Sequence, residues 1–205
     1  MNLYSYILMH DTGFAPCIQN NKLTLGCCKP NIRRTAKKGD YIIAFYGKSQ
    51  TDKKYSHALA YIAKVTKIMN YKQYYKNHKD RTDCIYNEKL QQLPNEFHNS
   101  NHTKRDLNGQ NILMSNDFIF FGKDAFHIDD KYLEMIGGRG HKVRKNEKFR
   151  KMFPKYFKEL KNKYGNYKLG DHLHQLNRTM HETKSKKRKL DSVVSKKVTT
   201  KKNKT

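Results

Sequence analysis

The sequence contains no apolar run long enough to cross a membrane. A transmembrane helix needs roughly 18 consecutive apolar residues, and no stretch of the 205 residues approaches that length. The first residues, Met1 to Ile7, also lack the basic start and long apolar stretch of a secretory signal. We therefore expect a soluble intracellular protein without a membrane partner, built as one domain plus a tail or as two small domains.

Tryptophan is absent and cysteine is scarce. The four cysteines are Cys17, Cys27, Cys28 and Cys84. None of them shows the C-x₂-C spacing that lets two thiolates converge on one zinc ion, and adjacent residues of a strand point to opposite faces. We favour reduced thiols over a zinc site, and we predict neither a metal nor a cofactor.

Acidic residues are few: 18 Asp and Glu stand against 43 Lys and Arg, which gives a formal net charge of +25. Such an excess indicates a polyanionic partner, DNA or RNA, although it does not exclude a neutral substrate. Residues 184–205 hold ten Lys or Arg and one acid and have no aromatic residue. We expect an α+β domain over residues 1–170 and a basic, mostly disordered tail over residues 171–205.

The tail contains a short basic run, Lys186, Lys187, Arg188 and Lys189. A run of this kind is typical of a nuclear localisation signal or of an arm that contacts nucleic acid without sequence preference. As a targeting signal it would place the protein in the nucleus, or in a viral replication compartment, of a eukaryotic cell.

Runs of β-forming residues outnumber helical patterns in the first 170 residues. We predict strands at 3–9, 23–25, 41–46, 57–68 and 112–121, the last able to break at 116–117. Short helices are expected at 31–37 and 71–78, and an amphipathic helix is expected around 149–160, where Pro154 marks a start or a kink. Together these favour a small, curved, mostly antiparallel sheet or half-open barrel with peripheral helices.

Several strings of residues carry a resemblance to a known family. They are Gly13-Phe14-Ala15-Pro16, Cys28-Lys29-Pro30-Asn31-Ile32-Arg33-Arg34-Thr35-Ala36, Gly39-Asp40, Ile112-Leu113-Met114-Ser115, Phe118-Ile119-Phe120-Phe121-Gly122 and Gly138-Arg139-Gly140-His141. Over about residues 1–165 the chain resembles the second nucleotide-modification-associated domain family. The Gly-Asp turn before an apolar strand is also similar to base-binding barrels of the PUA, EVE and YTH kind. The first resemblance implies a place in a pathway that makes or handles modified bases.

Two sets of side chains are candidates for binding a nucleotide. Lys29, Arg33 and Arg34 precede a buried strand and could hold phosphates, although a solvated helix face explains them equally well. Tyr46 and Tyr61 could line an aromatic slot that stacks a base, although most aromatic residues of this chain must belong to its core.

Candidate catalytic residues are His10, Asp11 and His141. A histidine beside a carboxylate can act as a general base near neutral pH, and ten histidines occur in the chain. Our leading hypothesis is a nucleic-acid-associated domain that recognises a base, modified in the favoured version, within a base-modification pathway. The alternatives are an enzyme that alters a nucleotide through His/Asp acid–base chemistry, and a viral structural protein that neutralises nucleic acid.

Overall fold

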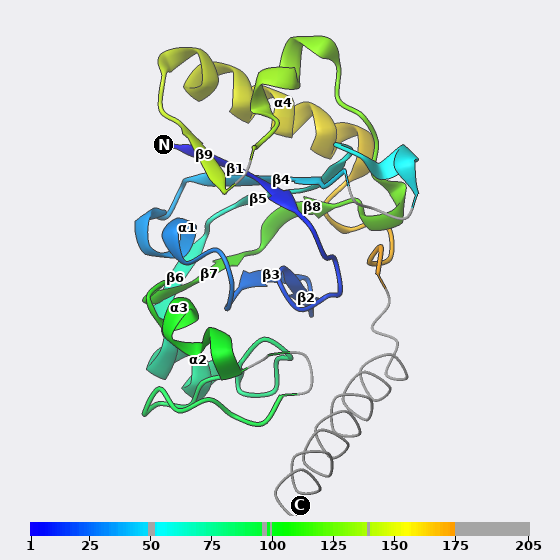
Figure 1. The fold of residues 1–205 in the computed structure, drawn as a ribbon. Helices are drawn as coiled ribbons and strands as arrows, with labels where there is room; N and C mark the ends of the chain where they lie inside the picture. The colour runs from blue at the N-terminus through cyan, green and yellow to red at the C-terminus, as the bar shows by residue number, and fades with distance from the viewer. Residues whose placement is uncertain (49–51, 96–97, 99, 139, 175–205) are drawn as a thin grey trace, which may run out of the picture. The chain divides into compact units, whose positions relative to one another are not determined.

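Two β-sheets form the frame of the protein, seen in a computed structural model (Figure 1). The structure describes residues 1–48, 52–95, 98, 100–138 and 140–174. Met1–His174 makes up one unit, which continues past residue 170, where we expected the domain to end. Residues 175–205, which make up most of the expected disordered tail and include its basic run, Lys186 to Lys189, lie outside the described residues.

The larger sheet has six strands in the order β10-β8-β5-β4-β1-β9, and the smaller sheet has four in the order β2-β3-β7-β6. The strands of the larger sheet are β1 (Leu3–Leu8), β4 (Tyr41–Tyr46), β5 (Leu59–Lys64), β8 (Asp117–Phe120), β9 (His141–Arg144) and β10 (Tyr167–Lys168). Those of the smaller sheet are β2 (Cys17–Gln19), β3 (Lys22–Leu25), β6 (Lys67–Asn70) and β7 (Asn111–Ser115). The α-helices of the described part are α1 (Pro30–Thr35), α2 (Tyr71–His78), α3 (Thr103–Leu107) and α4 (Glu147–Tyr164). Open sheets with few helices confirm the predicted α+β class.

β1 and β4 are neighbours that run in the same direction, from the pair Leu3–Tyr41 to the pair Leu8–Tyr46. Apart from β8 with β10, the other strand pairs of the described chain are antiparallel. Because parallel neighbours end at the same edge of a sheet, the segments that follow Leu8 and Tyr46 leave the sheet together. We call this the β1–β4 edge.

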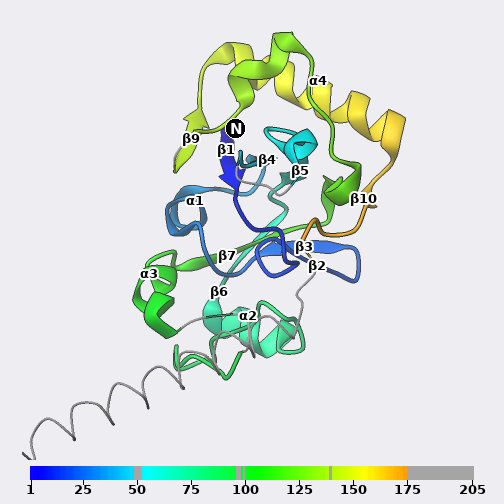
Figure 2. The same ribbon diagram turned by 45° about the vertical axis from the view of Figure 1, so that its right-hand side comes forward.

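The larger sheet is covered on both faces. α4 lies across one face, and the smaller sheet lies on the other side (Figures 1 and 2). Phe153 and Phe157 of α4 meet the ring of Tyr41 edge-on, with centroids 5.0 and 5.6 Å apart. Because side chains alternate along a strand, Tyr4 and Tyr6 of β1 face the smaller sheet instead.

Two expected strands divide between the sheets. Residues 57–68 give β5 in the larger sheet and β6 in the smaller one, and residues 112–121 give β7 and β8 in the same way. The second break falls at Asn116, where the sequence allowed one. β9 was missed: the expected glycine loop before His141 leads into a strand that pairs with β1.

Candidate nucleotide and nucleic-acid site

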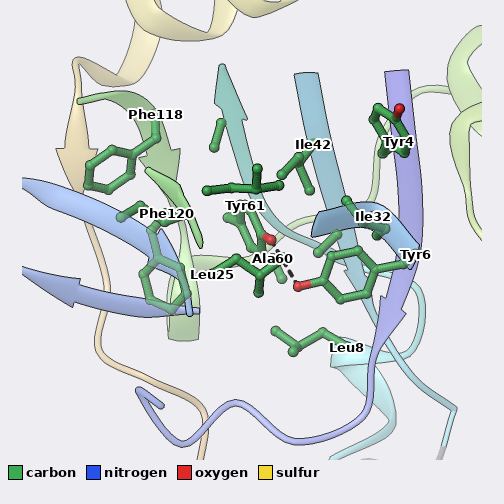
Figure 3. Close-up of a cluster of buried hydrophobic side chains, with 14 of the residues drawn as sticks. Tyr4, Tyr6, Leu8, Leu25, Ile32, Ile42, Ala60, Tyr61, Phe118 and Phe120 are labelled. Carbon is green, nitrogen blue, oxygen red and sulfur yellow. Dashed lines mark hydrogen bonds between the residues drawn. The ribbon is translucent and has the colours of Figure 1, made fainter. Parts of the chain in front are cut away.

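Tyrosines line the face of the larger sheet that looks toward the smaller sheet. Tyr6 and Tyr61 point at one another there, with hydroxyl oxygens 2.8 Å apart (Figure 3). Tyr46, the last residue of β4, belongs to the same cluster. All three side chains are fully buried, and burial raises the pKa of each hydroxyl above its usual range. The rings of Tyr46 and Tyr61 are therefore covered, and the structure does not expose them for stacking on a base.

The carboxylate of Asp11, just beyond β1, is fully buried among hydrogen-bond donors. Its Oδ2 accepts from the hydroxyl of Tyr46 at 2.5 Å and from the backbone N–H of Leu173 at 2.9 Å. Its Oδ1 lies 2.6 Å from Nδ1 of His172. The backbone of Asp11 is also paired with His174 through two hydrogen bonds. Asp11 thus joins the end of β1 to residues 172–174.

Lys29 reaches the β1–β4 edge from the start of α1. Its ammonium donates to the carbonyl of Ile7 at 3.2 Å and lies 4.2 Å from the centroid of the Tyr6 ring. Burial is the main cause that lowers the pKa of Lys29, and the nearby charge of Arg105 acts in the same direction. The structure therefore brings Lys29, Tyr46, Tyr61 and Asp11 to one end of the same sheet face.

Arg33 is placed elsewhere, in the interior. Its guanidinium donates to the carbonyls of Cys28, Asp106 and Asn111 and to the hydroxyl of Tyr71, and the residue is fully buried. A Cβ on Gly109 would come within 2.4 Å of the guanidinium carbon, so only glycine fits beside it. Arg33 holds α1, α3 and the start of β7 together, and a phosphate has no access to it.

Arg34 lies on the exposed side of α1. Asn108 and Asn31 accept hydrogen bonds from its two terminal nitrogens, both at 3.1 Å. Asn108 also lines a surface hollow of about 680 Å³ together with Lys104 and Arg105 of α3. We call Arg34, Lys104 and Arg105 the α1–α3 patch.

Neither of the two histidines expected to be catalytic, His10 and His141, is hydrogen-bonded to the carboxylate of Asp11. His10 is exposed, with its ring 6.1 Å from that of His174. His141 lies on β9, where its ring stacks on Tyr4 at 6.4 Å and where burial, helped by the charge of Lys29, lowers its pKa. The histidine that is bonded to the Asp11 carboxylate is His172, which was not among the candidates.

Sequence reasoning missed His172, Lys104 and Arg105. His172 stands 161 positions from Asp11, and nothing in the local sequence indicates that the two meet. Lys104 and Arg105 fall in a long polar segment that showed no helical pattern. A Lys-Arg pair inside a polar segment that holds several other charges of both signs is too common to have marked a site.

No metal centre emerges from the part of the chain that the structure describes, because no three potential ligands gather there. The four cysteines are free thiols. Within the same ranges, no helix combines the length and apolar character required to span a bilayer.

The fold is an α+β domain of two open sheets, with the buried Asp11 network just beyond the end of β1. The model of nucleotide modification associated domain 2 matches residues 1–89 and 78–180. The chain therefore belongs to this family, which confirms the resemblance seen in the sequence and gives the protein a role in nucleotide or base modification. No curated protein and no solved structure matches the chain.

Proposed function

We propose that this protein binds DNA through the α1–α3 patch as its part in nucleotide modification. The observation that carries the proposal is Arg34, which two asparagine side chains hold beside a hollow lined by Lys104 and Arg105. Arg recognises a phosphate with paired hydrogen bonds, whereas Lys acts as a point charge. Among the described residues no salt bridge neutralises these three side chains, so their charge is available to a partner.

The patch adjoins the β1–β4 edge. The charge of Arg105 helps to lower the pKa of Lys29. Among the described residues the ammonium of Lys29 donates one hydrogen bond, to Ile7, which leaves further N–H groups for a phosphate. A DNA backbone that runs past Arg105 toward Lys29 would bring one nucleotide to the end of β1. Recognition of a modified base at this point is the finer part of the proposal.

Replacing the two cations of α3 tests the proposal. In the full chain, Lys104→Gln with Arg105→Gln should weaken binding of a short DNA duplex about tenfold at physiological salt. It should also reduce the slope of log K against log salt by about 2, because two phosphate contacts are lost. Fluorescence anisotropy between about 50 and about 200 mM salt measures both quantities.

The matched control is Arg150→Gln with Lys155→Gln. It removes one Arg and one Lys, both exposed and without a salt bridge among the described residues, from α4, which covers the opposite face of the larger sheet, and binding should stay near that of the unchanged protein. Equal losses in both variants would show that the protein attracts DNA by overall charge, and the patch would be refuted. Competition between plain and modified duplexes then separates recognition of a modified base from sequence-independent neutralisation.

A further inference from the structure

His172 and Asp11 form a pair of the type that enzymes use to move protons. The buried carboxylate of Asp11 accepts from Nδ1 of His172 at 2.6 Å, which places the ring hydrogen on Nδ1 and the lone pair on Nε2. The hydroxyl of Tyr46 and the N–H of Leu173 hold the same carboxylate in place. An orienting carboxylate behind a histidine is the arrangement of general-base catalysis.

Nε2 of this ring has no hydrogen-bond partner among the residues that the structure describes, and the His172 side chain keeps 18% of its surface exposed. Gly13 packs closely beside this nitrogen: a Cβ at Gly13 would stand 3.2 Å from Nε2 and 3.1 Å from Cδ2. Both distances are shorter than an ordinary van der Waals contact, so any larger residue at position 13 would crowd Nε2, and the φ of +80° favours glycine there.

Residues 172–174 are held against β1 by hydrogen bonds that do not involve the imidazole of His172. The N–H of Leu173, which donates to the Asp11 carboxylate, and two hydrogen bonds between Asp11 and His174 already tie the segment to β1: the N–H of His174 donates to the carbonyl of Asp11, and the N–H of Asp11 donates to Nδ1 of His174. The ring of Phe120, 4.6 Å from that of His172, packs an apolar surface against the imidazole. The result is a fixed base with one accessible nitrogen.

We propose that His172 is an acid–base group for a nucleotide that binds at its partly exposed Nε2, beside Gly13. Nε2 accepts the proton of an N–H or O–H of that nucleotide, the negative charge stays on the nucleotide, and the imidazolium that forms is stabilised by Asp11. The same proton returns from Nε2 when the nucleotide is reprotonated, so the group is regenerated. This goes beyond DNA binding, and it rests on the family's role in nucleotide modification rather than on the α1–α3 patch.

Carbethoxylation with diethylpyrocarbonate, located by peptide mass spectrometry, tests the proposal because the reagent attacks neutral, accessible imidazole nitrogens. His172 of the full chain should be labelled, and Gly13→Ala should slow its labelling. Any of the four deoxynucleoside 5′-monophosphates, or a short single-stranded DNA, that binds at Nε2 should protect His172 from labelling. At about ten times its Kd such a ligand slows labelling about tenfold, since only the free fraction reacts.

Two substitutions distinguish the acid–base role of His172 from its role in holding the segment against Asp11. His172→Asn keeps a donor for Asp11 and loses the accessible nitrogen, so it should fold normally, whereas His172→Leu removes the donor as well. Absence of label at His172 in a chain whose exposed His10 is labelled would refute the proposal, and so would labelling that none of these five probes slows. DNA binding by His172→Asn, followed by anisotropy, should be unchanged, which keeps this result independent of the α1–α3 patch.

Discussion

Arg33 shows how a charged side chain can belong to the interior of a strongly basic protein. Three carbonyl groups and one hydroxyl accept its hydrogen bonds, and these acceptors come from three separate parts of the chain. A buried guanidinium is tolerated only when its donors are satisfied. The neighbouring Arg34 has the opposite environment, although the two residues are adjacent in sequence.

Replacing Arg33 should therefore cost stability, and replacing Arg34 should not. We expect Arg33→Gln to lower the free energy of unfolding by about 3–5 kcal/mol, because buried carbonyls lose their donors. Arg34→Gln should change it by less than about 0.5 kcal/mol, as exposed substitutions do. Urea denaturation followed by circular dichroism measures both, and a stable Arg33→Gln protein would contradict the structural role.

The four thiols should differ in reactivity. Burial raises the pKa of Cys17 and of Cys84 to about 12, so both remain protonated at pH 8. A hydrogen bond from Cys27 is the main cause that lowers the pKa of Cys28, and Cys28 is half-buried. Since the thiolate is the reactive form, iodoacetamide at pH 8 should label Cys28 first.

Mass spectrometry of the labelled peptides checks this order. Cys28→Ser is the control and should remove the fast phase without making another cysteine fast. In urea all four thiols should react at similar rates, because burial and the Cys27 hydrogen bond are then lost. Fast labelling of Cys17 or Cys84 in the folded protein would contradict the assigned burial effect.

At the scale of elements, α4 continues through an internal proline. The helix begins after Asn146, whose side chain accepts from the N–H of Phe149 at 3.1 Å, and it ends at Gly165 with a φ of 79°. Pro154 lies in between and cannot donate to the carbonyl of Arg150. The packing of Phe153 and Phe157 on the sheet outweighs this loss. Of the two sequence-based alternatives, a helix start at Pro154 is wrong, because the helix begins at Glu147 and runs for 18 residues.

Pro154→Ala should stabilise the protein. The alanine restores one helical hydrogen bond and removes a clash, a gain of about 1–3 kcal/mol that the larger freedom of the unfolded chain reduces somewhat. The comparison is Lys155→Ala, an exposed neighbour that should be nearly neutral. Urea denaturation measures both, and a loss of stability in Pro154→Ala would show that the proline ring is needed for packing.

Strand patterns explain how much of the fold the sequence could predict. Tyr41–Tyr46 and Leu3–Leu8 are rich in β-formers and buried nearly throughout, so their runs stood out. β2 and β9 are short and partly exposed, and a few residues beside polar or glycine-rich stretches carry little pattern. Which of two sheets a strand joins depends on contacts between distant residues, and local sequence does not contain that information.

At the scale of the whole molecule, the candidate site is assembled from remote segments. Residues from the end of β1, the end of β4 and the end of the unit meet around Asp11. The sequence named Asp11, Lys29 and Tyr46 as candidates from their neighbours in the chain, but it gave Tyr46 a stacking role that its burial does not allow. It could not predict His172 or the burial of Arg33, because both follow from long-range packing.

The closure of the Asp11 network also determines how the chain can be shortened. A fragment ending at Gly165 would retain every strand of the smaller sheet, yet it would lack β10, His172 and Leu173. Asp11 would then keep the hydroxyl of Tyr46 but lose the hydrogen bonds from His172 and Leu173. Expression boundaries for this chain should therefore include His174, since residues 171–174 complete the packing at the end of the first strand.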